Sequence, residues 1–384
     1  MNDICQSYKD ELQRLDASGN LRKLPSVVHD GKWVIDGGRK MLNLSSNDYL
    51  GLSTDKALRQ EFISNRMTEE CLFSSSSSRL LTGNYTIYDR LETLLADLFG
   101  AESALVFCSG YHMNTGILPA VTDSTTLILA DKLVHASIID GIRLSQAQCV
   151  RYRHQDYKQL EMLLQKHKDN FSRIIIVTES IFSMDGDIAP LYKLVELKKM
   201  YPNVMLYVDE AHAIGVRGDN GLGIAEEQGC IHDIDFLCGT FGKALSSVGA
   251  YVICRKAIRE FLVNRMRTLI FTTALPPVNV AWTYFIVEHL SQMKERRNAL
   301  NLVSSRLRDA LRAKDYDVAS ESHIVPMIVG KSSDTILKAE EMQRKGFYVL
   351  PVRPPTVPEG TSRLRFSLTA AVSEEEVGRL IEVL

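Results

Sequence analysis

Short apolar runs alternate with amphipathic helical patterns between about residues 85 and 255 of the chain. Seven runs are predicted strands, and most of them lack the in-and-out alternation of half-exposed strands. They lie at Ala104–Phe107, Leu127–Ala130, Cys149–Tyr152, Ile174–Thr178, Val204–Val208, Phe236–Gly239 and Gly249–Ile253. Runs of this kind are typical of strands that are buried on both faces of a mostly parallel sheet. The pattern therefore predicts an α/β fold with a mostly parallel seven-stranded sheet sandwiched by helices.

Helix signals occupy the intervals between these runs. Leucines at three- and four-residue spacing predict a helix that ends at Gly100. Asp156 is placed to cap a second helix, and Pro190 to open a third. Strands joined by helices through short loops complete the predicted layered architecture.

The pattern changes after about residue 280. A long helix at Asn298–Ala313 precedes shorter elements, and Ser373 with Glu376 predicts a capping box for the last helix. Further strands are expected at Ile324–Val329, Phe347–Leu350 and Leu364–Leu368. We expect an N-terminal helix and hairpin at residues 1–44, a large cofactor-binding domain at 45–280, and a small α+β domain at 281–384.

Composition excludes several classes of protein. The 384 residues carry a formal net charge of −2, which gives no basic field for nucleic acid. No apolar run reaches the roughly 20 residues that span a membrane, and residues 1–5 do not begin a secretory signal. The seven cysteines are scattered and include no CxxC, so we expect no metal site and a reducing, cytoplasmic compartment.

Asp209 and Lys243 are the most informative pair of residues. Each follows a predicted strand, and the carboxyl ends of parallel strands line one edge where ligands bind. A lysine and a carboxylate there suit pyridoxal 5'-phosphate (PLP), with the lysine as Schiff base and the carboxylate on the pyridine nitrogen. The spacing also fits a surface ion pair. A P-loop is excluded, because Leu237 and Ala244 stand where that motif needs glycine and Ser or Thr.

Seven motifs extend this hypothesis along nearly the whole chain. In order they are Asn47–Leu52, Ser78-Arg79 with Thr82-Gly83, Ser109–Tyr111, Asp131 with His135–Ser137, Glu179–Asp187, Asp209–His212 and Thr240–Lys243. The sequence thereby resembles the α-oxoamine synthases, a branch of the fold-type-I PLP enzymes. The resemblance implies a homodimeric acyltransferase that joins an amino acid to an acyl thioester with loss of carbon dioxide.

The resemblance also implies roles for individual residues at the cofactor. Lys243, Asp209, His135 and His212 would be catalytic, with Lys243 carrying PLP and shuttling a proton and His135 stacking on the ring. Ser183 and His212 would bind the ring hydroxyl. The phosphate would be held by Thr240, by the backbone of Gly110 and Tyr111, and by Thr272 or Thr273 of the neighbouring subunit.

The segment Arg353–Pro358, followed by Arg363-Leu364-Arg365, is most similar to the branch that condenses L-alanine with a pimeloyl thioester. Asn47 and Arg353 would then bind the amino-acid carboxylate, and Thr356 would face the acyl substrate. The family often has an arginine near position 21 for the acyl carboxylate. Here Leu21 occupies that position, so Arg22 is a candidate for that role and equally fits a solvated helix end.

Two further segments leave alternatives open. The run Ser74–Ser78 stands where the family commonly has glycines, which puts the geometry of that loop in doubt. Arg151, Arg153 and His154 form a basic cluster that could meet an acyl-carrier protein, although a solvated face is the simpler interpretation. Coenzyme A is the other possible acyl carrier.

Competing functions are a different condensing member such as glycine C-acetyltransferase, an aminotransferase, and a non-catalytic partner that keeps the fold. Arg353 and Thr356 argue against the first. The motif around His135, together with Arg353, argues against the second. The presence of Lys243, Asp209 and His212 argues against the third.

Overall fold

The computed structural model describes residues 4–65, 67 and 71–384, so residues 1–3 of the secretion argument lie outside the described residues. Contacts divide the chain into two compact units. The large unit comprises residues 55–183 and 188–297, and the small unit comprises Met1–Thr54, Met184–Asp187 and Asn298–Leu384. The boundaries of these two units differ from the predicted domains at residues 1–44, 45–280 and 281–384. Those three domains stay a prediction.

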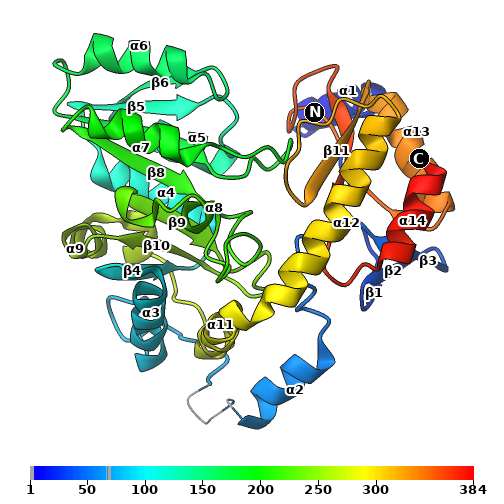
Figure 1. Ribbon diagram of the computed structural model, residues 1–384, viewed down its shortest axis with the longest axis horizontal. Helices are drawn as coiled ribbons and strands as arrows, with labels where there is room; N and C mark the ends of the chain where they lie inside the picture. Colours follow the sequence, from blue (N-terminus) through cyan, green and yellow to red (C-terminus); the bar gives the residue numbers. More distant parts are fainter. Residues whose placement is uncertain (1–3, 66, 68–70) are drawn as a thin grey trace. The chain divides into compact units, whose positions relative to one another are not determined.

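A seven-stranded sheet forms the centre of the large unit (Figure 1). Its strands are β4 (Ser103–Phe107), β5 (Thr126–Asp131), β6 (Gln148–Tyr152), β7 (Arg173–Glu179), β8 (Val204–Asp209), β9 (Phe236–Thr240) and β10 (Ala250–Cys254). They follow the order β4-β10-β9-β8-β7-β5-β6, and β10 alone runs in the direction opposite to the other six. The predicted mostly parallel sheet of seven strands is confirmed.

Burial explains why these runs could be recognised. Every residue of β4, β5, β9 and β10 is buried, as a sheet covered on both faces requires. The exception is β6, the edge strand beside β5, where Gln148 and Cys149 are exposed. The described cysteines are all free thiols, as expected.

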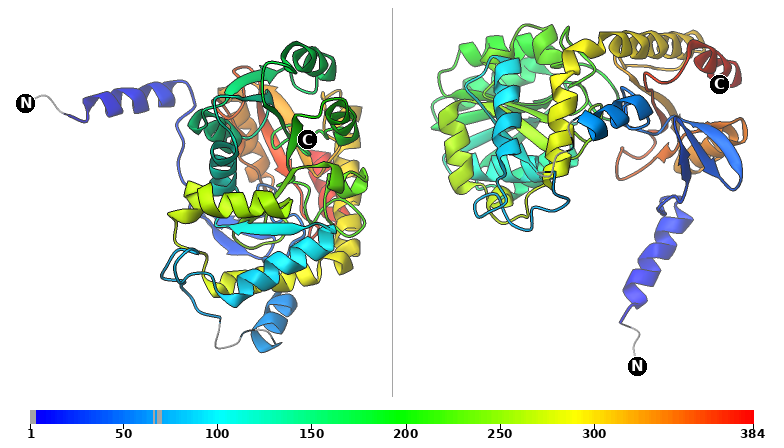
Figure 2. Two further views of the ribbon diagram at one scale, coloured as in Figure 1. Left: turned by 90° about the vertical axis from the view of Figure 1, so that its left-hand side faces the viewer. Right: turned by 90° about the horizontal axis from the view of Figure 1, so that it is seen from below.

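Helices lie on both sides of this sheet, as the right-hand view of Figure 2 shows. The helices of the large unit are α2 (Lys56–Asn65), α3 (Thr86–Phe99), α4 (Gly110–Val121), α5 (Ala136–Leu144), α6 (Tyr157–His167), α7 (Leu191–Lys199), α8 (Ile224–Glu227), α9 (Lys256–Arg265), α10 (Arg267–Ile270) and α11 (Pro277–Glu288), with short 3₁₀ turns at Ile231–Asp233 and Leu290–Met293. The predicted boundaries hold at three of them. Gly100 ends α3 in a left-handed conformation, Asp156 accepts a hydrogen bond from the Gln159 backbone, and Pro190 precedes α7.

The small unit contains two sheets of its own. Its strands are β1 (Val28–Asp30), β2 (Trp33–Asp36), β3 (Arg39–Asn43), β11 (Ile324–Gly330), β12 (Phe347–Tyr348), β13 (Pro351–Val352) and β14 (Ser362–Ser367). The helices are α1 (Gln6–Ala17), α13 (Ser332–Arg344) and α14 (Glu374–Val383), while α12 (Lys294–Ala313) enters this unit at Asn298. The Ser373–Glu376 capping box is present at α14.

The first of these sheets joins the two ends of the sequence. Strands β1, β2 and β3 pair with β12 in the order β1-β2-β3-β12, and Phe347 lies opposite Leu42. The second sheet has the order β11-β14-β13. Of the predicted strand at Phe347–Leu350, only Phe347–Tyr348 is a strand (β12), and the next strand, β13 at Pro351–Val352, belongs to the other sheet. The predicted N-terminal helix and hairpin are present as α1 and the antiparallel pair β2–β3, and β12 extends this hairpin on the β3 side.

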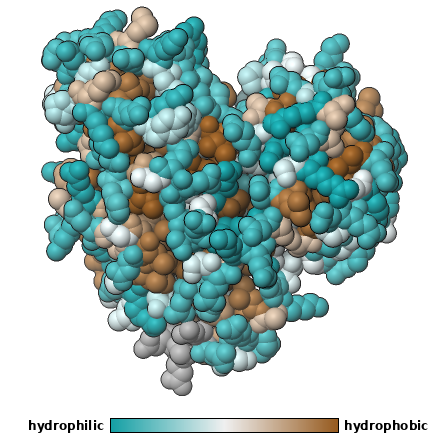
Figure 3. Space-filling model, in the orientation of Figure 1, coloured by the Kyte–Doolittle hydropathy of each residue, from teal (hydrophilic) through white to brown (hydrophobic). Residues whose placement is uncertain are grey.

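Hydrophilic residues cover most of the face in Figure 3, with apolar residues in small groups between them. None of the described helices has the length and apolar character needed to cross a membrane.

Candidate functional site

Lys243 and His212 meet at the carboxyl ends of β8 and β9. Asp209 is the last residue of β8 and His212 follows in the next turn, while Lys243 follows β9 after a two-residue turn. The Lys243 Nζ lies 2.8 Å from His212 Nε2. His212 is buried and Lys243 half-buried, so the amine is held at the sheet edge by a defined partner. The structure thus brings together two of the residues that the sequence assigned to one site.

Asp209 is buried beside them and held through both carboxylate oxygens. Its Oδ1 accepts the backbone N–H of Ala211 at 2.9 Å, and its Oδ2 accepts the Asn114 side chain at 2.9 Å. Asn114 lies on α4 and was not predicted. An asparagine inside a helix carries no signal of its own. Only its position five residues after Ser109 connects it to a motif.

The start of α4 is the predicted phosphate site, which we call the anion cradle. Ser109 caps this helix by accepting the His112 N–H, and Gly110 opens it. A Cβ at Gly110 would lie 3.9 Å from Thr240 Oγ1, so the helix start and the end of β9 are close neighbours. Free N–H groups at a helix start attract phosphate. The Tyr111 hydroxyl donates to Asp140 at 2.6 Å, so the predicted role of Tyr111 rests on its backbone N–H.

His135 precedes α5 in the same unit. Its Nδ1 accepts the Ser137 N–H at 3.2 Å and lies 2.8 Å from Ser137 Oγ. Surrounding protein atoms displace water from the ring and lower the pKa of His135, the Asp209 charge opposing this, although part of the residue remains exposed. A neutral imidazole with an exposed part suits contact with a planar ring.

Two buried carboxyl groups lie next to the site without a predicted role. Burial raises the pKa of Glu210 to about 7, although its oxygens accept hydrogen bonds from Ser180, Ile224 and Ala225. Burial also raises the pKa of Glu179, opposite Asp209 in the sheet, well above its usual value. Glu210 accepts hydrogen bonds from the start of α8 and so links α8 to the end of β8. This residue of the predicted motif thus has a structural role.

Ser183 and Thr273 are less defined by the geometry. Ser183 is buried in the loop after β7. Thr273 is exposed, and its carbonyl accepts a hydrogen bond from Cys108 at 3.2 Å, while Thr272 is half-buried. Their predicted roles at the cofactor stay predictions.

Three candidate substrate residues lie together in the small unit. Arg22 donates to Thr356 Oγ1 at 2.8 Å, and Arg353 donates to the carbonyls of Gly19 and Leu21. Desolvation lowers the pKa of the Arg353 guanidinium, and the neighbouring Arg22 charge acts in the same direction. Two cations held this close favour a bound anion.

Asn47 belongs to a different group within that unit. Its Oδ1 accepts the Tyr49 hydroxyl at 2.9 Å and lies 3.5 Å from Arg365 Nη1. Its recorded partners among the described residues are thus Tyr49 and Arg365. Arg365 belongs to the Arg363–Arg365 motif, but the sequence predicted no role for it. In the structure its guanidinium lies beside Asn47.

The serine run adopts a backbone that usually belongs to glycine. Ser76 has φ 52°, in the left-handed region. Ser75 donates to the Ala274 carbonyl at 2.7 Å and the Ser77 carbonyl accepts the Ala274 N–H at 2.9 Å, which fastens the run to the segment before α11. The loop geometry is therefore reached with serine.

Much of the basic cluster is engaged locally. Arg153 pairs with Asp156 at 2.6 Å, His154 lies 2.9 Å from Asp131, and Arg151 donates to the Lys132 carbonyl. These contacts favour the solvated face over a docking site.

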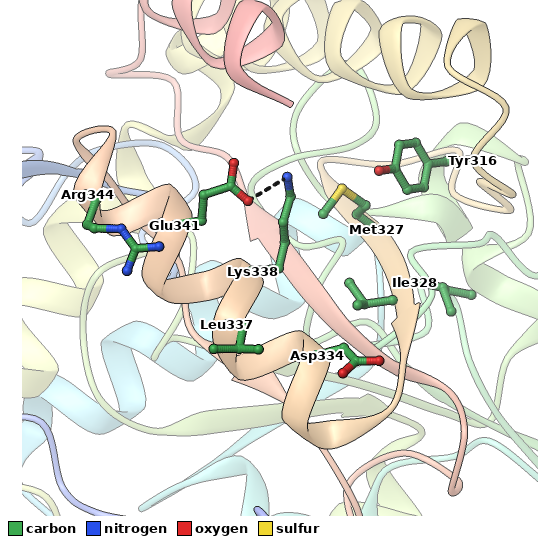
Figure 4. Close-up of a pocket in the computed structure, with 9 residues that line it drawn as sticks. Tyr316, Met327, Ile328, Asp334, Leu337, Lys338, Glu341 and Arg344 are labelled. Atoms are coloured by element: carbon green, nitrogen blue, oxygen red, sulfur yellow. Dashed lines mark hydrogen bonds and ion pairs between the residues drawn. The ribbon is translucent and has the colours of Figure 1, made fainter.

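Hollows elsewhere on the surface differ in character from this site. One of about 650 Å³ lies against α13 and β11 and is lined by Leu337, Met327 and an ion pair of Lys338 with Glu341 at 3.1 Å (Figure 4). Another of about 680 Å³ lies between α6 and α7. Neither contains a predicted site residue. Within residues 4–65, 67 and 71–384, no group of His, Cys, Asp or Glu is arranged to hold a metal ion.

Comparison with known proteins places this geometry in context. The model of the family "Aminotransferase class I and II" matches residues 39–384. The chain is 56% identical over 384 residues to 8-amino-7-oxononanoate synthase from Haemophilus ducreyi, covering 98% of this chain and 99% of that protein.

Solved structures are similar along nearly the same length. A serine palmitoyltransferase from S. paucimobilis, solved with PLP linked to myriocin, has a TM-score of 0.90 and 28% identity, covering 100% of this chain and 97% of the other. The 8-amino-7-oxononanoate synthase from Francisella tularensis has a TM-score of 0.73 and 28% identity, covering 89% and 96%.

Proposed function

Because this chain belongs to the 8-amino-7-oxononanoate synthases, PLP-dependent enzymes of the class I and II aminotransferase family, we propose that it condenses L-alanine with a pimeloyl thioester. In this reaction Cα of alanine forms a bond to the thioester carbonyl carbon. The thiol leaves, and the alanine carboxylate departs as carbon dioxide. The product is 8-amino-7-oxononanoate, an intermediate of biotin biosynthesis.

The residues of the large unit fit PLP. The observation that carries the proposal is the Lys243 amine at 2.8 Å from His212, one strand end away from the anchored Asp209. When bound, PLP supplies an electron sink for the negative charge that develops at Cα. A second feature of the same unit supports the fit, because Gly110 beside Thr240 leaves room for a phosphate at the α4 start.

Each residue of the large unit then has a defined task. Asp209 binds the ring nitrogen and holds its proton, and His135 covers the ring face. Lys243 holds the cofactor and moves the proton at Cα, a task that a free lysine with pKa near 10.4 performs poorly without a neighbouring base. Backbone N–H groups at Gly110 and Tyr111 bind the phosphate with Thr240.

Hydrogen bonds to the ring hydroxyl complete the cofactor contacts. His212 and Ser183 are the residues that we assign to this oxygen. Both are buried, so their hydrogen bonds act in a medium where they are stronger than in water.

The small unit supplies residues for the two substrate carboxylates. Arginine pairs with carboxylate through two parallel hydrogen bonds, which suits both the amino acid and the free end of a pimeloyl chain. We assign Arg353 and Asn47 to the alanine carboxylate, and Arg22 with Thr356 to the acyl carboxylate. The 2.8 Å bond between Arg22 and Thr356 supports their common task.

A second copy of this chain is the partner that we propose. In the large unit, Phe73, Leu81 and Phe271 are 77%, 79% and 71% exposed, and main-chain bonds tie residues 72–77 to 274–278. Large apolar side chains on a fixed surface are typical of an interface. Thr273, next to Phe271, would then reach the phosphate of the other subunit. The cytoplasm, where thiols stay reduced, is the proposed compartment.

One assay tests the reaction. Purified protein with PLP is given L-alanine, glycine or L-serine, each with pimeloyl or acetyl thioester, and products are identified by mass spectrometry. We expect 8-amino-7-oxononanoate and carbon dioxide from alanine with pimeloyl thioester. Preferential condensation of glycine with the acetyl thioester would replace the proposal by glycine C-acetyltransferase. Parallel reactions with coenzyme A and acyl-carrier-protein thioesters identify the acyl carrier.

A further inference from the structure

Asn114 links two residues of the cofactor site that are far apart in sequence. Its side-chain nitrogen lies 2.9 Å from Asp209 Oδ2 and 2.9 Å from Ser137 Oγ. Its side-chain oxygen lies 2.6 Å from the Tyr207 hydroxyl. Ser137 in turn contacts His135 Nδ1 at 2.8 Å. The side chains of Asn114, Ser137, Tyr207 and Asp209 are all buried.

The donor and acceptor of each of these hydrogen bonds follow from the chemistry of the groups that form them. An ionised carboxylate only accepts, so the atom facing Asp209 is the amide nitrogen. The amide oxygen must then face Tyr207, which donates because burial raises the pKa of its hydroxyl well above the usual value. The second amide hydrogen points to Ser137 Oγ and makes this oxygen an acceptor.

The remaining hydrogen of Ser137 can serve His135. The Ser137 backbone N–H donates to His135 Nδ1 at 3.2 Å, so that nitrogen carries no proton in this arrangement. The Ser137 hydroxyl, whose oxygen accepts from Asn114, then donates its hydrogen to Nδ1 as well, and the two donors share the single Nδ1 lone pair. A neutral His135 then carries its proton on Nε2, and all hydrogens of Asn114 and Ser137 are committed.

Close packing of α4 against α5 holds this series of hydrogen bonds in place. A Cβ added at Gly141 on α5 would lie 2.2 Å from the Asn114 carbonyl oxygen, a distance that real side chains do not adopt. Glycine therefore lets the two helix backbones approach until Ser137 reaches Asn114. The geometry depends on this contact and not on a flexible surface loop.

We propose that Asn114 is a positioning residue, which orients the Asp209 carboxylate and, through Ser137, fixes the tautomer of His135. The inference deepens the proposed function, because it concerns the same cofactor site. The Asn114 amide thereby couples Asp209, which we assign to the ring nitrogen, with His135, which we assign to the ring face. Only an amide supplies both donors and the acceptor. Aspartate at position 114 would face Asp209 with an acceptor and a like charge.

The first test uses the cofactor-free protein and measures no activity. Long-range ¹H–¹⁵N spectra of ¹⁵N-histidine protein report the tautomer of each ring, and His135 is assigned by its loss in His135→Gln. We expect the Nε2–H form in the wild type. In Ser137→Ala, and less fully in Asn114→Leu, we expect a larger fraction of the Nδ1–H form, while the backbone N–H of residue 137 keeps the Nε2–H form in the majority. A His135 ring with its proton on Nδ1 in the wild type would overturn the inference.

The second test measures PLP affinity and kinetics. Losing a hydrogen bond to a charged group has a typical effect of about 10- to 100-fold, so Asn114→Leu and Asn114→Asp should lower kcat by that factor. The KM for alanine should change by less than about threefold, because Asn114 acts through Asp209. Tyr207→Phe should have a smaller effect, since it frees only the acceptor of Asn114. Full kcat in Asn114→Asp would contradict the inference.

A double-mutant cycle separates positioning from loss of packing. If Asn114 and Ser137 act in one chain, the effects of Asn114→Leu and Ser137→Ala on kcat are less than additive. Additive effects would refute the link. The matched control is Asn170→Ala, which removes an exposed amide bonded to the Lys166 carbonyl at 3.4 Å and should leave kcat, tautomer and PLP affinity unchanged.

Melting temperatures of the cofactor-free variants identify any that fail to fold. If Asn114→Leu is unfolded, Tyr207→Phe and Ser137→Ala carry the test. If the wild type does not condense alanine with pimeloyl thioester, the proposed function fails. The tautomer measurement still decides the inference in that case.

Discussion

The cofactor residues of the large unit and the substrate residues of the small unit are held in opposite ways. Asp209 ends a buried strand and both its oxygens accept hydrogen bonds within the unit. Arg22 and Thr356, by contrast, are exposed on loops and make one recorded contact with each other. Cofactor chemistry is thus tied to the sheet, while the groups that we assign to substrate choice can change without disturbing a core.

The largest expected effect lies at Lys243. Lys243→Ala removes both the covalent attachment and the proton shuttle, so condensation should fall by at least about 10³-fold. In the wild type, borohydride reduction and peptide mapping should place the PLP label on Lys243. Lys256→Ala, at the exposed start of α9, is the control and should keep full activity. A PLP label on another lysine would contradict the assignment of Lys243 and, with it, the contrast between the two units.

Asp209→Asn tests whether the sheet edge supplies charge or only shape. A neutral amide does not hold a protonated ring nitrogen, so kcat should fall by about 10²- to 10³-fold while PLP still binds. Steady-state kinetics and PLP titration measure the two effects separately. Asp233→Asn changes a half-buried carboxylate that pairs with Lys199 at 3.0 Å, and it should change neither quantity. Equal losses of kcat and PLP affinity in Asp209→Asn would assign the residue to binding alone.

Arg353 tests the same contrast in the small unit, among the residues that we assign to substrate. If its guanidinium binds the alanine carboxylate, Arg353→Ala should raise the KM for alanine by about 10- to 100-fold with an unchanged melting temperature. Its bonds to the Gly19 and Leu21 carbonyls offer a different role, namely holding the N-terminal segment. A lower melting temperature with normal alanine KM would establish that role. Arg22→Ala is the companion variant and should raise the KM for the pimeloyl thioester instead.

The smallest expected effect concerns backbone strain in the serine run. Ser76 has a left-handed backbone, which costs about 1 kcal/mol for a residue with a side chain. Ser76→Gly removes this cost but adds flexibility to the unfolded chain, so the net gain should be about 0.5 kcal/mol. Ser77→Gly has no such strain to relieve and should destabilise by a similar amount. Thermal unfolding of the cofactor-free variants measures both. A loss of stability in Ser76→Gly would contradict the strain argument.

The central sheet could be predicted because its signal is local. A strand buried on both faces must be apolar along its length, and β4, β5, β9 and β10 show this in the sequence itself. Lys243 and Asp209 were identifiable for a related reason, since the carboxyl ends of parallel strands meet at one edge. The adjacency of Lys243 and His212 follows from the same rule.

Other features depend on contacts that the sequence does not encode locally. Asn114 reaches Ser137 only because Gly141 lets α5 approach α4. The pairing of β3 with β12 joins residues about 300 positions apart, and two-residue strands such as β12 carry no periodicity. The bond between Arg22 and Thr356 is likewise a product of loop placement. Such contacts arise from tertiary packing, which local residue preferences do not determine.

The antiparallel strand β10 has a consequence for the order in which the protein folds. Pairing of β10 with β9 closes a loop of about ten residues, whereas its pairing with β4 brings together segments about 145 residues apart. Distant pairings are generally slower because they close larger loops. Gly110 follows β4 and Thr240 ends β9, so the anion cradle is incomplete until β10 joins both. During refolding, tight PLP binding should therefore appear with the β4–β10 pairing, later than helix formation and later than the β9–β10 hairpin.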